Sequence, residues 1–325
     1  MNHFIRSLAV CGLLAIASAI APHDARAGAF PDKPIRLIVG TTPGTGPDVV
    51  ARMLGDRIAA LLGQAIVIDN RPGASGTIAL AALARAPADG QTLGLLNMPF
   101  VVAPLILPQV PYDTERDLQP VALLNQNHFL LAVRAESTHR SLEQLVTAAR
   151  ARPGALKYSS TGIGTPGHLA LKLLEQASGI ELLHVPYRGG PAAVTALLSG
   201  DVDVQAGLPA LAPHIADGKL RPLAALTTQR LPGYPALPTT RELGYPAVVV
   251  NDWQGIVAPA GTPRAIVDQL AAAVAQVVAQ PDLQARFETM GMSPARGGAD
   301  EFAALIRSEI AHWRRVVREA NIKAE

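Results

Sequence analysis

The feature of this sequence that most limits its fold is a regular alternation of short apolar runs with longer amphipathic stretches. Residues 35–39 (IRLIV) form the first apolar run, which is typical of a buried strand. Val50, Leu54 and Ile58 then recur at the spacing of one helix face, and residues 65–69 (AIVID) form the next strand. Strands that alternate with helices usually pair in parallel beneath those helices, so the pattern predicts an α/β fold.

The same alternation indicates two lobes. At ~150 residues per domain, 325 residues correspond to about two domains. The pattern runs to about residue 205, pauses in a Pro- and Gly-rich loop at 231–246, and resumes with a strand at 253–258. No linker separates the halves, so we expect strands at 130–134 and 253–257 to carry the chain between two mostly parallel sheets flanked by helices. The expected domains are residues 28–130 with 253–325 as lobe 1, which is discontinuous, and residues 131–252 as lobe 2.

Residues 1–27 have the pattern of an export signal. Arg6 is followed by an uncharged run over 7–21, and Ala25-Arg26-Ala27 fits a cleavage site. The run is shorter than the roughly 20 residues that a membrane-spanning helix needs, although an uncleaved anchor is the alternative. The single cysteine, Cys11, lies inside it, so cleavage near Ala27 leaves no thiol for a disulfide, a zinc site or a nucleophile. We therefore expect an exported protein.

Composition excludes several functions. The net charge is only +2, with 17% charged residues, so no basic surface is available to neutralise nucleic-acid phosphates. Aromatic residues make up 4%, too few for a base-stacking platform. The histidines have no metal-ligand spacing, which predicts no metal site. Gly162, Gly164 and Gly167 match G-x-G-x-x-G, but the following strand ends without the acidic residue that a nicotinamide cofactor requires, so we expect no cofactor.

Two segments rich in Gly, Thr and Ser each join a strand to a helix, at 41–48 and 159–165. A helix start presents free backbone N–H groups and about half a positive charge, and it can hold a carboxylate or phosphate without an arginine. The alternative is ordinary strand-to-helix turns that only cap their helices. If both turns face one cleft, they would clamp a small anion. The candidate binding residues are Thr41, Thr42, Gly44, Thr45, Gly46 and Asp48 in the first turn and Ser160, Thr161, Gly162, Gly164 and Thr165 in the second.

A secreted serine hydrolase is an alternative from a different class of function. No G-x-S-x-G elbow is present, but Ser160 and His168 lie on one turn and its helix, where a Ser–His contact is conceivable. The simpler interpretation is that His168 packs near the helix start and donates a hydrogen bond there.

The order of several segments carries a family resemblance. These segments are FPDKPIR at 30–36, DVVAR at 48–52, DNRPGASG at 69–76, YSSTGIGT at 158–165 with His168-Leu169, HVPYRGG at 184–190, PTTRELG at 238–244 and PAGTP at 259–263. Together they resemble the extracytoplasmic solute-binding proteins of tripartite tricarboxylate transporters, the Bug receptor family. The resemblance covers essentially the whole chain after the signal.

The resemblance implies a two-lobed periplasmic-binding-protein fold that closes on a small organic carboxylate without catalysis. It places the ligand at the two turns, with His168 beside the second and Tyr187 and Arg188 near the cleft. It also implies a periplasmic monomer that passes its ligand to a membrane permease, or alternatively reports it to a sensor protein. The first turn departs from the family pattern, because Thr41 stands where an aromatic residue is usual. This change should widen or polarise that side of the pocket, and the sequence does not select among dicarboxylates, citrate-like acids, acidic amino acids and aromatic acids.

Overall fold

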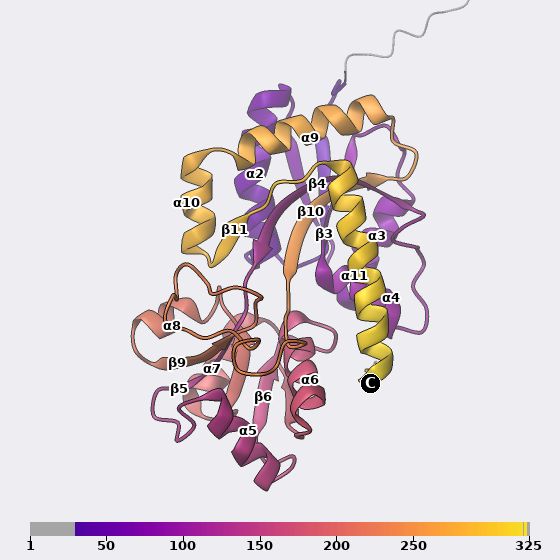
Figure 1. Ribbon diagram of the computed structural model, residues 1–325. Helices are drawn as coiled ribbons and strands as arrows, with labels where there is room; N and C mark the ends of the chain where they lie inside the picture. Colours follow the sequence, from indigo (N-terminus) through magenta and orange to yellow (C-terminus); the bar gives the residue numbers. More distant parts are fainter. Residues whose placement is uncertain (1–29, 321, 324–325) are drawn as a thin grey trace, which may run out of the picture.

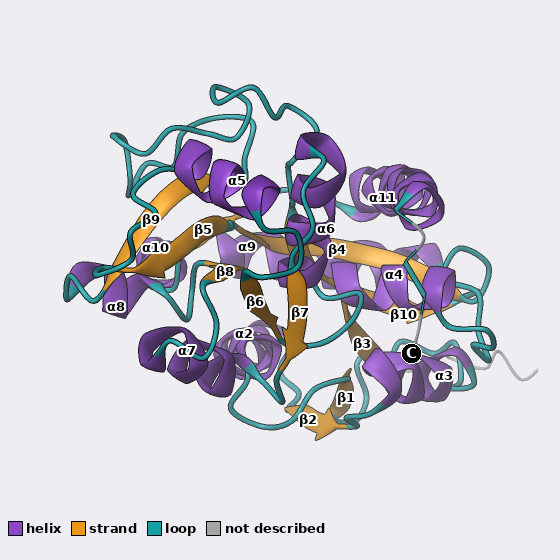
Figure 2. Ribbon diagram, turned by 90° about the horizontal axis from the view of Figure 1, so that it is seen from below, coloured by secondary structure: helices purple, strands orange, loops and turns teal. Residues whose placement is uncertain are grey.

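The computed structural model describes residues 30–320 and 322–323, which form two sheets, each flanked by helices (Figures 1 and 2). The predicted export signal lies outside these residues. The first sheet has the strand order β11-β4-β10-β3-β1-β2, and the second has the order β7-β6-β8-β5-β9. No described helix is both long enough and apolar enough to cross a membrane.

The strands of the first sheet are β1 (Ile35–Val39), β2 (Ile66–Asn70), β3 (Thr92–Asn97), β4 (Leu118–Asn127), β10 (Asp252–Pro259) and β11 (Met292–Pro294). Those of the second are β5 (Leu130–Arg134), β6 (Lys157–Ser160), β7 (Leu183–Pro186), β8 (Val204–Gly207) and β9 (Leu220–Ala225). The helical segments are α2 (Gly46–Leu62), η1 (Ala74–Gly76), α3 (Thr77–Ala84), α4 (Met98–Ile106), α5 (Leu142–Ala151), α6 (Pro166–Ser178), α7 (Gly190–Ser199), α8 (Ala212–Ala216), α9 (Arg264–Val278), α10 (Pro281–Thr289) and α11 (Ala299–Glu319).

Both sheets are mixed, rather than mostly parallel as the strand–helix alternation suggested. In the first sheet β1 pairs in parallel with β2 and β3, but β10 runs antiparallel to β3 and β4. In the second, β6 pairs in parallel with β7 and β8, whereas β5 runs antiparallel to β8 and β9. The first strand after each passage, β5 in the second sheet and β10 in the first, therefore runs against its neighbours, and the short edge strand β11 is antiparallel to β4.

The passages themselves lie between strands. One is the two-residue step from Asn127, which ends β4, to Leu130, which begins β5. The other is the segment 226–251, which begins after β9 and ends at β10. This long segment packs on the second sheet, where the amide of Ala225 in β9 donates to the Pro238 carbonyl at 2.8 Å. The expected crossing strands, 130–134 and 253–257, therefore each belong to a single sheet.

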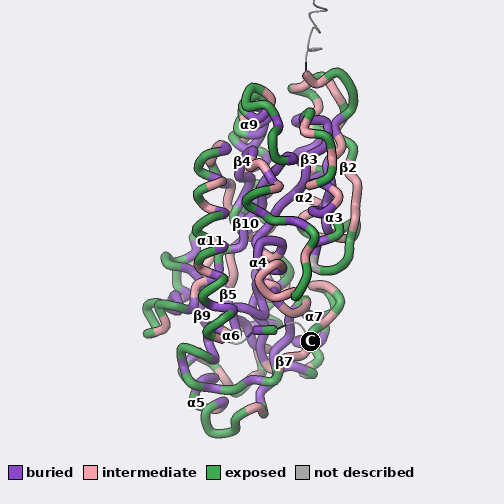
Figure 3. The backbone as a smooth tube through the Cα atoms, turned by 90° about the vertical axis from the view of Figure 1, so that its right-hand side faces the viewer, coloured by how far each residue is buried: buried purple, intermediate pink, exposed green. Residues whose placement is uncertain are grey.

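The buried residues are mainly apolar, and the exposed residues lie mostly on the outer helices and loops (Figure 3). Helices α2 and α9 pack together over the first sheet, with Val50, Leu54, Val267 and Val274 in one apolar cluster. Pro263 is the N-cap residue of α9, and the hydroxyl of Thr262 before it donates to the Pro259 carbonyl at 2.8 Å.

Candidate functional site

A cavity of about 760 Å³ lies between the two sheets. Its walls follow the carboxyl ends of β1 and β3 in the first sheet and of β6 and β7 in the second, the edge at which open α/β sheets usually bind ligands. Turn 1 (residues 40–48) and turn 2 (residues 160–166) both contribute to it. The lining residues are Gly40, Thr41, Thr42, Thr45, Pro47, Gly73, Gly76, Asn97, Pro99, Phe100, Ala103, Ile106, Leu107, Thr161, Gly162, Ile163, Gly164, Thr165, Pro166, Pro186, Gly189 and Gly190.

Turn 1 is held in shape by the carboxylate of Asp48, which is almost fully buried. It accepts hydrogen bonds from the Gly44 amide at 2.8 Å, from Asn70 Nδ2 at 2.9 Å and from Arg52 Nε at 3.0 Å. The Asn70 amide also donates to the Thr41 carbonyl at 3.0 Å. Asp48 therefore fixes the backbone of the turn from behind and does not line the cavity.

These contacts also fix the charge of Asp48. Burial by itself would raise the pKa of the carboxyl group, but the hydrogen bonds from Arg52, the Gly44 amide and Asn70, together with the Arg52 charge, outweigh burial and hold the pKa below its ordinary value. The group is therefore ionised at neutral pH, where its negative charge compensates Arg52.

Replacing Asp48 with alanine is expected to lower the free energy of unfolding by about 2 kcal/mol, because it removes several charge-assisted hydrogen bonds at a buried site. Urea denaturation at neutral pH measures the effect. Asp56→Ala is the matched control, since Asp56 is exposed on the same helix and should change stability by less than about 0.5 kcal/mol. Equal effects of the two substitutions would contradict the structural role of Asp48.

Turn 2 is held by side chains from its own two ends. The Gly162 amide donates to Ser160 Oγ at 3.0 Å, and the Gly164 amide donates to His168 Nδ1 at 3.3 Å. The hydroxyl of Thr165 donates to the Gly162 carbonyl at 2.6 Å. Gly162 and Gly164 have φ of 128° and 75°, a region that only glycine enters without strain. The glycines are thus required by the shape of this turn.

His168 accepts a hydrogen bond from the turn, whereas the sequence suggested that it would donate one. Burial and the nearby His184 and Lys172 lower the pKa of His168 to about 3, so the ring is neutral at physiological pH. A neutral imidazole leaves Nδ1 free to accept from the Gly164 amide. His168 itself is buried behind turn 2 and does not line the cavity.

The Ser–His contact considered for a hydrolase is made with a different histidine. Ser160 Oγ lies 2.7 Å from His184 Nε2. Tyr158 and His184 are level on the neighbouring strands β6 and β7, and their rings stack with centroids 4.8 Å apart. Because Ser160 follows Tyr158 by two residues, it lies on the same face of β6 and meets the His184 ring. Ser160 is 2% exposed and bonded to the turn 2 amide, an arrangement that supports the loop.

The structure separates the predicted binding residues into two groups. Those on the cavity surface are Thr41, Thr42, Thr45, Thr161, Gly162, Gly164 and Thr165. Those outside the lining are Gly44, Gly46, Asp48, Ser160, His168, Tyr187 and Arg188. Tyr187 packs beside an apolar cluster of the second sheet, while Arg188 is exposed. Their neighbours Pro186, Gly189 and Gly190 form that part of the wall instead.

One wall of the cavity was not predicted from the sequence. Asn97 and helix α4 supply it, and α4 was not expected because prolines at 99 and 104 interrupt its pattern. The signal that could have found it is the spacing of Pro99 or Phe100, Ala103, and Ile106 or Leu107, which places apolar residues on one helix face.

The two turns give the cavity its electrostatic character. Thr45 and Thr165 are the N-caps of α2 and α6, both line the cavity, and neither side chain caps its own helix. The positive ends of two helix dipoles therefore face one space. Thr41, Thr42 and Thr161 line the same space, whereas the hydroxyls of Thr45 and Thr165 donate to carbonyls of their own turns. None of the described residues that line this space is charged. Such a site can hold an anion through backbone amides and hydroxyls alone.

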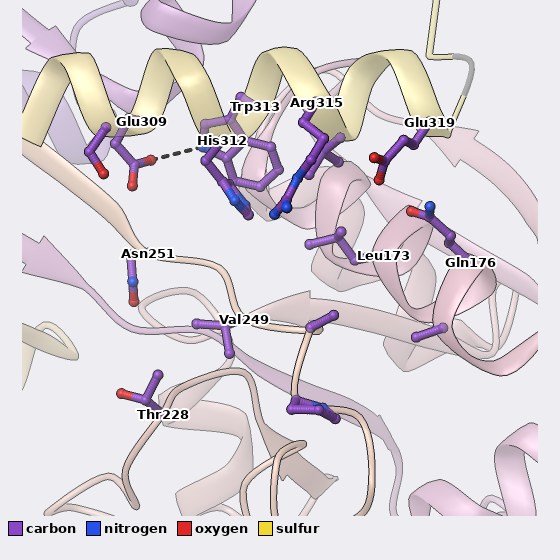
Figure 4. Close-up of a pocket in the computed structure, with 15 residues that line it drawn as sticks. Leu173, Gln176, Thr228, Val249, Asn251, Glu309, His312, Trp313, Arg315 and Glu319 are labelled. Carbon is purple, nitrogen blue, oxygen red and sulfur yellow. Dashed lines mark hydrogen bonds between the residues drawn. The ribbon is translucent and has the colours of Figure 1, made fainter.

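A second cavity of about 600 Å³ lies between α11, α6 and the segment 226–251 (Figure 4). Figure 4 shows Glu309, His312 and Arg315 projecting from α11 toward Leu173 and Val249. Glu309 accepts a hydrogen bond from Trp313 Nε1 at 2.8 Å, and burial raises the pKa of this carboxyl group. Neither turn reaches this cavity, and ionisable groups line it, so it lacks the features of the first.

Two α/β lobes enclose a cavity that receives two helix N-termini, an arrangement that fits a solute-binding receptor. Comparison with known proteins agrees. Residues 50–322 match the family described as "Tripartite tricarboxylate transporter family receptor" (TctC), and the chain belongs to this family. A protein of Pseudomonas sp. strain P51, described as "UPF0065 protein in tcbD-tcbE intergenic region", is 37% identical over 96% of this chain and 94% of its own length.

Solved structures support the same assignment. An R. palustris protein, Rpa4515 with adipate, superposes with a TM-score of 0.83 at 33% identity, covering 90% of this chain and 99% of its own. The periplasmic binding protein BugD superposes with a TM-score of 0.81 at 27% identity, covering 91% of this chain and 100% of its own. MatC from Rhodopseudomonas palustris with bound malate superposes with a TM-score of 0.80 at 31% identity, covering 89% of this chain and 100% of its own. The chain is therefore a receptor of the periplasmic-binding-protein fold.

Proposed function

We propose that this receptor captures a small organic carboxylate in the cavity between turns 1 and 2 and delivers it to a membrane permease of the tripartite tricarboxylate type. One observation carries the proposal: the N-caps of α2 and α6, one from each sheet, line a single cavity whose described lining has no charged side chain. A carboxylate placed there accepts hydrogen bonds from both turns at once. The adipate and malate bound by two of the similar structures belong to this chemical class.

The proposed mechanism is closure of two lobes on the ligand. Lobe 1 holds the strands of the first sheet, up to Asn127 and from Asp252 onward, and lobe 2 holds those of the second sheet from Leu130, so each expected boundary moves by one to three residues. The chain passes between the lobes at 128–129 and in the segment 226–251. Turn 1 belongs to lobe 1 and turn 2 to lobe 2, so an acid that contacts both turns adds binding energy only when the lobes are close. The acid therefore shifts the population toward the closed form. We assign the protein to the periplasm, in keeping with BugD.

Calorimetric titration of ligand-free protein tests the capture step. The panel contains succinate, malate, adipate, citrate and glutamate, with a neutral sugar and a dipeptide amide as controls. We expect saturable binding of one acid per chain and no binding of the neutral compounds. Binding of a neutral compound without binding of any acid would contradict the proposal. Delivery is tested separately, because deleting the gene should abolish uptake of the acid that binds if a permease depends on this receptor.

A further inference from the structure

One face of α4 forms an apolar wall along the ligand cavity. Phe100, Ala103 and Ile106 recur at helical spacing and line the cavity together with Pro99 and Leu107. Each of these side chains is a hydrocarbon, so this helix face offers no hydrogen bond to a ligand. We call these five residues the α4 wall.

The α4 wall reaches both turns. The Phe100 ring packs against the first turn so closely that a methyl group on Gly40 would lie 2.6 Å from its Cζ atom. At the other end, Ile106 Cδ1 lies 3.0 Å from the position that a methyl group on Gly164 would occupy. Phe100 is 4% exposed, whereas Pro99, Ile106 and Leu107 are only half-buried. The apolar surface open to a ligand therefore comes from Pro99 near turn 1 and from Ile106 and Leu107 near turn 2.

Asn97 is the polar group at the beginning of this wall. It occupies the N-cap position of α4, yet its side chain makes no capping hydrogen bond. It is 5% exposed, and its Oδ1 atom has no hydrogen-bond partner among the described residues. Leu95 and Val39 are level on the parallel strands β3 and β1, so Asn97, the last residue of β3, lies beside Thr41, which follows β1. The Nδ2 group of Asn97, rather than its Oδ1 acceptor, is the part of the amide that can donate to a carboxylate beside turn 1.

From this arrangement, and resting on the proposed function, we propose that the receptor prefers acids with an unsubstituted hydrocarbon body, which lies on the α4 wall while Asn97 and the two turns hold the carboxylate end. Ile106 and Leu107 are the specificity-determining residues. A hydroxyl group on the ligand body would lose its hydrogen bonds to water against this wall and gain none in return. The receptor therefore discriminates against hydroxylated acids of the same length.

Succinate and malate form a matched pair for the test, because they differ by one hydroxyl group on the same four-carbon chain. We expect calorimetry to give succinate an affinity at least about tenfold higher than that of malate. Equal affinities, or tighter binding of malate, would overturn this inference and leave the proposed function intact. If neither these acids nor the other carboxylates of the panel bind, the proposed function itself fails.

Two variants separate specificity from general loss of binding. Ile106→Asn places an amide on the wall and should reduce the succinate-to-malate affinity ratio by about tenfold, whereas Ile106→Val should preserve it. Asn97→Ala should lower the affinity for both acids by about tenfold and leave the ratio of the two affinities unchanged. Thermal melting shows that each variant is folded. An unchanged ratio in a folded Ile106→Asn protein, or unchanged affinities in Asn97→Ala, would contradict the assigned roles.

Discussion

Replacing Asp252 with asparagine is expected to raise the free energy of unfolding by about 3 kcal/mol near neutral pH and to change it little near pH 4. Asp252 begins β10 and is level with Asn127 at the end of β4, directly beside both passages between the sheets. Its Oδ2 atom accepts from Asn127 Nδ2 at 2.6 Å. Burial raises the pKa of the carboxyl group from 3.8 to about 6, and the nearby charge of Glu309 raises it further.

The sign of this effect follows from proton binding. Between about pH 4 and pH 6 the folded protein binds a proton at Asp252 that the unfolded chain has released, so stability falls as the pH rises through this range. Above the folded pKa the buried carboxylate is charged and costs about 3 kcal/mol. Asparagine stays neutral and can still accept the hydrogen bond from Asn127.

Urea denaturation of both proteins at about pH 4.5 and pH 7.5 measures the difference. Asp56→Asn, at an exposed position on α2, is the control and should leave the pH dependence unchanged. A stability difference between wild type and Asp252→Asn that is the same at both pH values would show that the Asp252 carboxyl group does not titrate in this range.

Replacing Gly164 with valine is expected to reduce affinity for the bound acid by about a hundredfold or more, a loss of about 3 kcal/mol. Gly164 has a φ of 75°, which a β-branched residue adopts only with strain. Its Cβ atom would also lie 3.0 Å from Ile106 Cδ1, which belongs to the opposite lobe. The two γ-methyl groups of valine reach further toward α4, so turn 2 and Ile106 have to move apart, which weakens the contacts proposed between both turns and the carboxylate.

Gly179→Val separates the backbone strain from the effect on binding. Gly179 is the C-cap of α6, the helix that follows turn 2, and it has a φ of 64°. Nothing lies within 4 Å of the position that a Cβ atom would take there. Both variants should lose about 1–2 kcal/mol of stability from the left-handed backbone. Only Gly164→Val should lose affinity in calorimetry. Comparable losses of affinity in the two variants would place the cause in general destabilisation.

The regular strands and helices could be predicted because burial and periodicity agree in them. Residues 35–39 form β1 with the predicted bounds, since an apolar run between turns has few alternatives. Helix α4 was missed because its prolines disrupt the pattern, and β4 was missed because its last residues are polar. Asn125 and Asn127 are buried in that strand by neighbouring strands that local sequence does not reveal.

The candidate site could be predicted only in part, and for a similar reason. Glycine and threonine between a strand and a helix mark both turns, and seven of the residues chosen on that basis line the cavity. The sequence suggested His168 as the partner of Ser160 because the two are close along the chain. The register between β6 and β7 brings His184 to Ser160 instead. The α4 wall depends on how the lobes face each other, which single segments do not encode.

The uncharged lining has a consequence for release of the acid. A receptor that binds its ligand through a buried arginine leaves an uncompensated cation when the ligand departs, and restoring water to that cation becomes part of opening. In the proposed site the donors are backbone amides and hydroxyls, which are neutral and therefore cost less to leave without the ligand than a buried cation does. Release of the acid then depends on how far the two turns separate. Added salt should change the affinity for the acid only weakly.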